Sequence, residues 1–404
     1  MTFDPEELKK RRAQRKRKRL LFWLRLGIGV LVLAACALTI WYLSESKKPS
    51  ESEVNDPANQ TVIHLAAAGD LNVTQRVIES GGANYQYTDM LMDVLPLLSD
   101  ADITTLNFEG NLYGEPYGTD RSAPQSLMTA LERAGVDYIQ LANSYSIYHG
   151  MDGLSRTLQG IRQAGMEPLG AYATRQEAQE KKGYTICTVQ GIKIAFVAFT
   201  KGMDGMALPA GNEGCVNVLY EDYATDYQTV DKEGINKVLA AAEKEKPDIT
   251  VAFVHWGSEF NDNISASQET VCKVMQAGGV DVILGTHSHY VQRMDFDPEK
   301  GTFVAWSLGD FLGDANRAGS EYSVVLKLEI TKNAVTGQTK VTGYSYTPIF
   351  TVNEADKPLR VVRIAEAMTG YRQGYIDKVE ESTFNAMEYA LGRIEARIHA
   401  KKEK

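Results

Sequence analysis

The feature that most constrains this chain is an uncharged apolar run near its start. From Leu26 to Leu43, eighteen consecutive residues carry no charge, which is enough for a helix that spans a bilayer. Residues 1–25, which precede the run, contain ten Lys and Arg against three Asp and Glu, whereas residues 44–60 after it are polar and mixed in charge. Because basic flanks stay in the cytoplasm, we expect a single-pass protein of the cell membrane with a cytoplasmic N-terminus and an extracellular C-terminal domain.

A cleaved signal peptide is the alternative interpretation of the same run. The run is longer than the apolar region of most signal peptides, and residues 40–43 lack a small-x-small cleavage site. The basic segment alone would also suit nuclear localisation or RNA binding, but the chain after residue 25 holds 33 basic and 49 acidic residues, a net charge of −16. This balance argues against a nucleic-acid partner, and the uncleaved anchor is the preferred interpretation.

The anchor divides the chain into five parts. They are a basic cytoplasmic tail (1–25), a transmembrane anchor (26–43), an extracellular linker (44–60), one large domain (61–350) and a helical C-terminal extension (351–404). With 44% hydrophobic and 24% charged residues, and only 12 Pro, the chain is neither disordered nor low in complexity.

Cysteine usage does not indicate a metal or disulfide framework. The four cysteines show no CxxC or Cys/His zinc spacing, and they are Cys36, Cys187, Cys215 and Cys272. An external compartment permits one disulfide, but buried small apolar side chains are the simpler interpretation.

Short apolar segments alternate with amphipathic ones in the large domain. Residues 61–70 and 101–110 have the pattern of strands, while 89–100 and 124–135 have the 3.6-residue period of helices. Such alternation predicts a sheet covered by helices. We therefore expect an α/β fold.

Other segments add antiparallel strands and a helical end. Gly191 separates two strand-like segments, 184–190 and 193–200, and predicts a β-hairpin. The sheet should therefore be mixed. Residues 358–400 have a helical pattern, and no internal repeat of 20 to 50 residues is visible, which disfavours solenoids and propellers.

Side chains able to bind metal stand at the predicted carboxyl ends of successive strands. In open α/β sheets the ligand crevice lies at this edge. These residues are Asp70, Glu109, Asn143 with Ser144, His255, and His287 with His289. A carboxylate such as Glu109 can bridge two ions while Asp, Asn and imidazole fill the other positions. The donor set suits two divalent ions of Mn, Fe or Zn.

Six sequence blocks carry a family resemblance. In order they are AAAGDLN, TTLNFEGNL, YIQLANSYSIYHGMDGLSRTLQGIRQAGMEPLGA, VAFVHWGSEF, QAGGVDVILGTHSHYVQ and FVAWSLGDF. Together they resemble the CapA family of capsule (poly-gamma-glutamate) synthesis proteins, whose domain belongs to the calcineurin-like metallophosphoesterase superfamily. The resemblance implies a four-layer αββα metallophosphatase-like sandwich at a bacterial cell surface. It also implies a role in making, exporting or anchoring capsular polymer, beside membrane-bound synthetase partners.

The resemblance assigns roles to individual residues. Asp70 matches the first metal-binding Asp, Glu109 the bridging acid, His255 the ligand of the HWG block, and His287 with His289 the paired histidines. Asn107 stands two residues before Glu109 in its block.

Two blocks depart from the family pattern. Where the family reads Leu-Ala-Asn-Asn-His, this chain has Ser144 in place of the metal-binding Asn and Tyr145 in place of the His that protonates the leaving group. Asp310 replaces the Asn of SLGNF. Ser is a poor neutral ligand and Tyr a poor acid at neutral pH, so we expect slow or undetectable hydrolysis unless Asn143 or His149 compensates by a local shift.

Three functional hypotheses follow. The first is an anchored capsule-type protein that handles an anionic polymer or its phosphorylated precursors. The second is an active surface phosphoesterase that depends on metal. The third is a noncatalytic scaffold that keeps the fold.

Overall fold

The computed structural model describes residues 5–45, 50–374 and 379–400, which belong to two compact units, Met1–Asn59 and Gln60–Lys404. The first unit consists of α1 (Pro5–Glu45), α2 (Glu51–Val54) and a 3-10 turn, η1 (Pro57–Asn59). Over Lys16–Tyr42, α1 is long and apolar enough to cross a membrane, and its apolar side chains are exposed. The predicted linker is partly helical, because Ser50 and Glu53 form a capping box at the start of α2.

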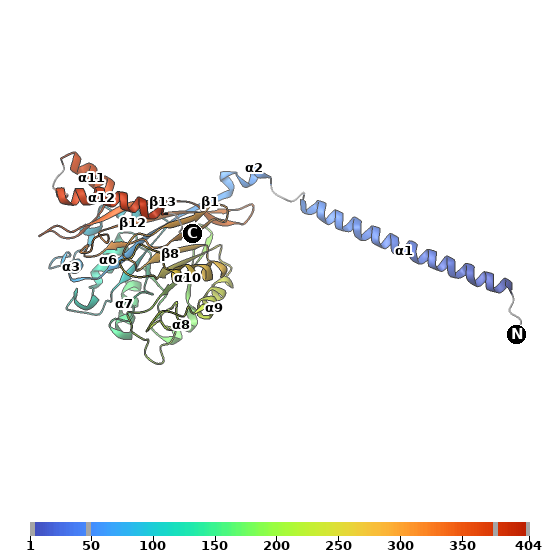
Figure 1. Cartoon of the computed structure of the whole chain (residues 1–404), viewed down its shortest axis with the longest axis horizontal. Helices are drawn as coiled ribbons and strands as arrows, with labels where there is room; N and C mark the ends of the chain where they lie inside the picture. Colours follow the sequence, from blue (N-terminus) through green and yellow to red (C-terminus); the bar gives the residue numbers. More distant parts are fainter. Residues whose placement is uncertain (1–4, 46–49, 375–378, 401–404) are drawn as a thin grey trace. The chain divides into compact units, whose positions relative to one another are not determined.

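The second unit is built on two mixed sheets (Figure 1). The first sheet has the order β14-β13-β12-β1-β2-β3-β4, with β11 paired to β1. Its strands are β1 (Gln60–Asn72), β2 (Ile103–Glu109), β3 (Tyr138–Gln140), β4 (Glu167–Leu169), β11 (Asp310–Leu312), β12 (Tyr322–Asn333), β13 (Thr339–Val352) and β14 (Arg360–Arg363). The second sheet has the order β5-β6-β7-β8-β10-β9. Its strands are β5 (Tyr184–Val189), β6 (Ile192–Thr200), β7 (Ile249–His255), β8 (Val282–Thr286), β9 (Met294–Asp297) and β10 (Thr302–Ala305).

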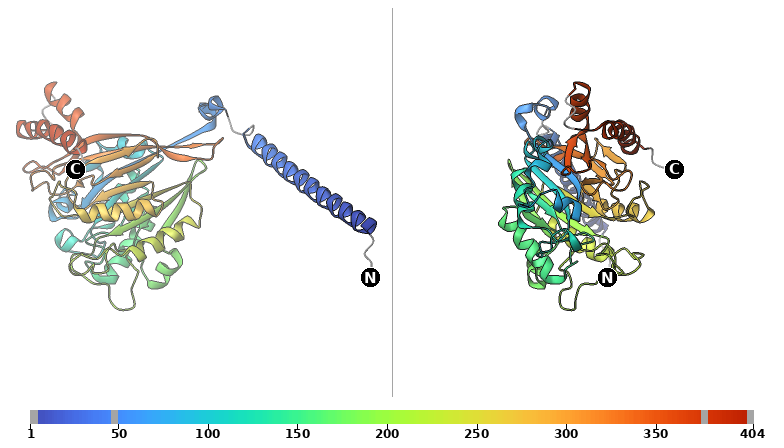
Figure 2. Two further views of the ribbon diagram at one scale, coloured as in Figure 1. Left: turned by 45° about the vertical axis from the view of Figure 1, so that its right-hand side comes forward. Right: turned by 90° about the vertical axis from the view of Figure 1, so that its left-hand side faces the viewer.

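The sheets pack face to face and carry helices on their outer faces (Figure 2). Between the sheets, Tyr138 of β3 contacts Phe196 of β6 with ring centroids 4.7 Å apart. The core of the first sheet includes buried residues of α3 (Gln75–Glu79), α4 (Thr88–Leu91), α5 (Leu95–Ser99), α6 (Gln125–Arg133) and α7 (Gly150–Gln163). The outer face of the second sheet packs on α9 (Lys232–Glu243) and α10 (Ala266–Ala277). The predicted four-layer αββα architecture is therefore confirmed.

Local predictions are confirmed in most places and wrong in two. Strands β5 and β6 form the antiparallel hairpin expected at Gly191. The helix expected over 89–100 is two short helices, α4 and α5, with Pro96 in the first turn of α5. The helix expected over 358–400 begins with a strand instead, because Val361 and Val362 are buried and pair with β13. After β14 follow α11 (Ile364–Arg372) and α12 (Glu381–Ile398), whereas α8 (Arg175–Lys181) precedes the hairpin.

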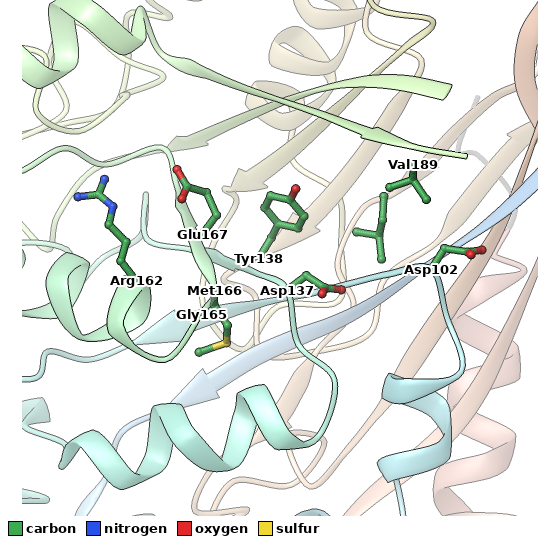
Figure 3. Close-up of a pocket in the computed structure, with 9 residues that line it drawn as sticks. Asp102, Asp137, Tyr138, Arg162, Gly165, Met166, Glu167 and Val189 are labelled. Carbon is green, nitrogen blue, oxygen red and sulfur yellow. The ribbon is translucent and has the colours of Figure 1, made fainter. Parts of the chain in front are cut away.

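An aspartate stands directly before each of four parallel strands and binds the backbone of the neighbouring strand. Each carboxylate accepts a hydrogen bond from a neighbouring N–H at 2.7 to 2.8 Å, and each aspartate N–H donates to the carbonyl of that same neighbour. The pairs are Asp102 with His64, Asp137 with Thr104, Asp248 with Lys193, and Asp281 with Thr250. The hollow in Figure 3 is lined by Asp102 and Asp137 at this amino edge, and their carboxylates are already engaged. It is not the predicted site.

Candidate metal centre

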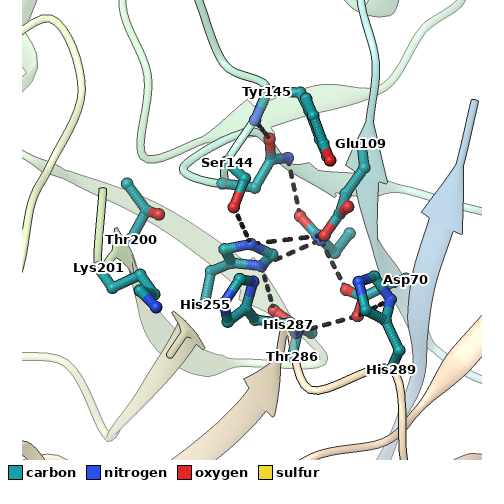
Figure 4. Close-up of polar contacts among 12 residues, drawn as sticks. Asp70, Glu109, Ser144, Tyr145, Thr200, Lys201, His255, Thr286, His287 and His289 are labelled. Atoms are coloured by element: carbon teal, nitrogen blue, oxygen red, sulfur yellow. Dashed lines mark hydrogen bonds and ion pairs between the residues drawn. The ribbon is translucent and has the colours of Figure 1, made fainter. Parts of the chain in front are cut away.

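The residues predicted to bind metal come together where the carboxyl ends of both sheets meet (Figure 4). Asp70 lies near the end of β1 and Glu109 ends β2 in the first sheet. His255 ends β7 in the second sheet, and His287 and His289 follow β8. All five are buried. The strand-end pattern therefore identified one shared location.

Two groups of ligand atoms overlap at Asp70. The first group is Asp70, Glu109 and His255, and the second is Asp70, His289 and Asp310; within each group the ligand atoms lie within 4.8 Å of one another. Asp310 faces Asp70 because β11 pairs with β1 at this position, and its Oδ1 lies 2.7 Å from His289 Nδ1. Asp70 is the carboxylate common to both groups, and Glu109, which the resemblance implies as the bridging acid, belongs to the first group; its bridging role stays a prediction.

Asn107 orients the two carboxylates of the first group. Its Nδ2 donates to Asp70 Oδ1 at 2.7 Å and to Glu109 Oε1 at 3.2 Å. Its Oδ1 accepts a hydrogen bond of 3.0 Å from Asn143 Nδ2. Asn143 also donates to the carbonyl of Phe108 at 2.7 Å, and its Oδ1 accepts from Tyr145 N at 2.9 Å. The side-chain amide of Asn143 is therefore engaged with protein partners. Asn143 contributes by orienting Asn107, which in turn binds the candidate ligands Asp70 and Glu109.

Ser144 lies beside His255, where the family pattern has the second Asn. Its Oγ is 3.1 Å from His255 Nε2, and the same ring nitrogen is 3.4 Å from Glu109 Oε1. The other ring nitrogen, Nδ1, is 3.1 Å from Thr286 Oγ1. Ser144 thus occupies the expected place with a hydroxyl instead of an amide oxygen.

Tyr145 is held by an arginine rather than exposed as a proton donor. Arg121 donates from one terminal nitrogen to Tyr145 Oη at 2.9 Å, and the guanidinium carbon lies 4.1 Å from the ring centroid. Burial raises the pKa of Tyr145 to about 12, and nearby Arg121 only partly offsets it. The phenol therefore stays protonated at neutral pH and is a weak acid.

His149 does not join the ligand groups. Its Nε2 lies 2.6 Å from the carbonyl oxygen of Asp120, and its ring stacks on Tyr113 with centroids 4.3 Å apart. The backbone N–H of His149 donates to Asn111 Oδ1 at 3.0 Å, at the start of α7. The shift that would let His149 replace the family histidine is not seen.

Nearby positive charge only partly offsets the burial of the two carboxylates Asp70 and Glu109. Burial raises the pKa of Asp70 to about 7, although His289, Asn107 and the His287 N–H favour its charged form. Burial and the neighbouring Asp70 also raise the pKa of Glu109. Buried carboxyl groups with raised pKa values are suited to bind a divalent cation, which replaces the protons that they would otherwise hold.

Two of the three imidazoles are already in the form that binds metal, whereas His289 would have to release a proton. Burial lowers the pKa of His255 and His287, so both rings are neutral, which is the form that ligates metal. Among the described residues, His287 Nδ1 is buried without a hydrogen-bond partner. Burial also lowers the pKa of His289, but Asp310, Glu109 and Asp70 together outweigh burial and raise it to about 10. The residues present therefore fit a metal centre.

Several residues near the centre were not anticipated from the sequence. Lys201 directly follows β6, its N–H donates to the His255 carbonyl at 2.8 Å, and burial lowers the pKa of its amine. Figure 4 shows it near His255 and His287. The strand-end rule that found the histidines would also have found Lys201. Phe260, which stacks on His289 at 4.8 Å, lies in a loop, and Arg121 lies in the 3-10 turn η2 (Thr119–Arg121); neither directly follows a strand, so neither gave such a signal.

Comparisons with known proteins find two sequence relatives and one solved structure that are similar to most of this chain. Capsule biosynthesis protein CapA of Bacillus anthracis is 24% identical over 315 residues, covering 76% of this chain and 71% of that protein. PGA biosynthesis protein CapA of Bacillus subtilis (strain 168) is 23% identical over 327 residues, covering 78% and 79%. The crystal structure of calcineurin-like phosphoesterase YfkN from Bacillus subtilis aligns at 16% identity with a TM-score of 0.45, covering 82% of this chain and 99% of that one. A score this low says nothing about chemistry.

The family model of the bacterial capsule synthesis protein PGA_cap matches residues 64–315, which include every candidate ligand from Asp70 to Asp310. That span is more than half of the chain. The chain therefore belongs to the PGA_cap family of bacterial capsule synthesis proteins, to which its sequence blocks pointed.

Proposed function

We propose that this protein is a membrane-anchored, cell-surface capsule protein with a dinuclear metal centre. It would act in the synthesis, export or anchoring of a capsular polymer such as poly-gamma-glutamate. The observation that carries the proposal is the pair of buried ligand groups that share Asp70. One carboxylate between two groups is the usual arrangement for two cations held a few ångströms apart.

The ligand for such a centre would be anionic. Bound divalent ions would supply Lewis acidity and positive charge. The chain after residue 25 is strongly acidic, so an anionic polymer or phosphorylated precursor would be repelled unless the site itself were cationic. Two divalent ions beside Lys201 would provide that local charge, and Asp70, Glu109 and His255 would hold one of them.

An active surface phosphoesterase is the second candidate, and Arg121 favours it. The family histidine is absent, but Arg121 places a cation against Tyr145, and its charge acts on Glu109. A guanidinium can stabilise negative charge on a departing oxygen without giving up a proton. Ser144 and Tyr145 nevertheless lead us to expect slow turnover.

Metal analysis and a phosphatase assay test the proposal together. The full chain, purified in detergent without chelator and then supplied with Mn, Fe or Zn, should retain about two ions per chain. Hydrolysis of an aryl phosphate would support the phosphoesterase, whereas metal without hydrolysis would support a centre that only binds its anionic ligand. Absence of any retained metal would leave the noncatalytic scaffold.

The orientation of the anchor is part of the proposal. The apolar helix over Lys16–Tyr42 supports an anchored protein, and the basic residues near the start of the chain support a cytoplasmic N-terminus. External protease should digest the part after residue 44 in intact cells and leave a short N-terminal stub. Protection of the large unit would refute this orientation, and a mature chain that starts near residue 40 would favour a cleaved signal.

Membrane-bound polymer synthetases are the proposed partners, and crosslinking in membranes should recover them.

A further inference from the structure

The C-terminal helix α12 reaches the loops on one side of the metal centre. Its buried apolar residues pack on the first sheet, and they are Met387, Ala390, Ile394 and Ile398. Beside this face, Arg393 and Arg397 lie one turn apart, and both contact Asp262 in the loop that follows His255. The closest nitrogen to Asp262 Oδ2 is a terminal nitrogen of Arg397, at 3.1 Å.

The ion pair between Arg397 and Asp262 differs from an ordinary surface pair in how little of the arginine is exposed. Its side chain is only 10% exposed. The guanidinium carbon lies 4.7 Å from the ring centroid of Tyr290, which directly follows His289, and 5.6 Å from that of Tyr322 on β12. The mostly buried guanidinium of Arg397 thus joins the helix both to the loop that follows His255 and to the loop that carries His287 and His289, although its partner Asp262 is 37% exposed.

Phe260 completes the connection to the ligand. It lies two residues before Asp262, its ring stacks on His289 at 4.8 Å, and it meets Tyr290 edge-on at 6.0 Å. Its N–H donates to the carbonyl of Ser288 at 2.8 Å. The path from Arg397 to His289 is therefore continuous through packed side chains.

The same loops adopt a backbone conformation that must be held in place. Phe260, His287 and His289 have φ angles of 52°, 88° and 58°. None is glycine, and side chains disfavour this left-handed region unless the surroundings fix it. The contacts of Arg397 are placed where such support is needed.

We propose that Arg397 is a positioning residue that holds the His289 loop in its metal-binding conformation. The inference rests on the proposed metal centre, and it adds a role for α12, which lies outside the residues that match the family model, 64–315. Arg397 would touch neither metal nor substrate. It would act through Asp262 and Tyr290.

The test compares three variants of the full chain in detergent. Arg397→Met keeps the apolar stem but removes the charge, and Arg397→Lys restores the charge without the planar fork. Glu395→Ala is the matched control, because Glu395 lies on the same helix and accepts a hydrogen bond of 2.7 Å from Tyr346 of β13 instead. Co²⁺ affinity and its visible absorption spectrum report the centre, and hydrogen exchange of residues 286–291 without metal reports the loop.

Arg397→Met should weaken Co²⁺ binding about 10-fold or more, change the spectrum and speed exchange in the loop. Arg397→Lys should recover part of each effect, and Glu395→Ala should lower thermal stability with little effect on either readout. Unchanged affinity and exchange in Arg397→Met, or equal losses in Glu395→Ala, would overturn the proposal. If the wild type binds no Co²⁺, the proposed centre fails, and the exchange data alone decide whether Arg397 holds the loop.

Discussion

The two ligand groups at the sheet edge share Asp70 but differ in what surrounds them. The group with His289 gains a carboxylate, since Asp310 stands where the family pattern has Asn, and Phe260 packs on its imidazole. The group with Glu109 and His255 has instead lost an amide, because Ser144 offers only a hydroxyl at 3.1 Å from His255. We therefore expect the group that contains Asp310 to bind its ion more tightly than the group beside Ser144.

The largest effect should come from the residue that both groups share. Asp70→Asn keeps the shape of the side chain but removes the shared charge, so both ions should be lost. Metal content by mass spectrometry should fall from about two ions to fewer than half an ion per chain, while circular dichroism shows the fold retained. If one ion remains at full occupancy, Asp70 is not the shared ligand.

Restoring the family block should repair the weaker group. Ser144→Asn together with Tyr145→His supplies an amide ligand and a proton donor, and general-acid catalysis contributes of the order of 10² to 10⁴ in rate. The rate of aryl phosphate hydrolysis by the double variant should therefore exceed that of the wild type by a factor that approaches this range. Either single variant should gain less, since both groups act on one transition state. Brisk hydrolysis by the wild type that is lost in His149→Ala would contradict this account.

Single changes should separate the two groups. Glu109→Gln should weaken one ion and Asp310→Asn the other, each by about 10-fold or more, because each change removes one charge from one group. A two-step Co²⁺ titration of the full chain measures the two affinities. Loss of the same step in both variants would show that the groups are not separate sites.

The smallest effect should come from a carboxylate remote from both groups. Glu354 is buried and binds Lys357 Nζ at 2.7 Å, the N–H of Glu380 at 2.6 Å and Thr383 Oγ1 at 3.0 Å. Burial raises the pKa of Glu354, but these hydrogen bonds outweigh burial and lower it. Glu354→Gln should cost about 1 to 3 kcal/mol of unfolding free energy at pH 7 and leave metal binding unchanged.

The pH dependence of that cost has a defined sign. The folded pKa of Glu354 lies below the unfolded value of about 4.3, so its stabilisation is present above that pH and is lost as pH falls through the folded pKa. Denaturant unfolding of both proteins at pH 7 and pH 3 should show the difference shrinking at pH 3. A difference that grows at pH 3 would contradict the assignment.

The sequence predicted what depends on local pattern. Alternating strands and helices, the hairpin at Gly191 and the gathering of Asp70, Glu109 and the three histidines follow from periodicity and from the rule that ligands lie at strand ends. The roles within the centre depend on which strands become neighbours. Asp310 reaches Asp70 only because β11 pairs with β1. The side-chain amide of Asn143 donates a hydrogen bond to Asn107 of β2 and is therefore engaged within the protein. Neither pairing can be deduced from spacing along the chain.

The aspartates that directly precede the parallel strands fix the position of each strand's amino end relative to its neighbour. Asp102 precedes the seven residues of β2, which end at Glu109, and Asp248 precedes the seven residues of β7, which end at His255. In each sheet, therefore, the candidate ligand is the seventh residue after an aspartate that is bound to the neighbouring strand. Glu109 and His255 are thus placed by their strands, and one residue inserted within β2 or β7 would turn the ligand to the opposite face.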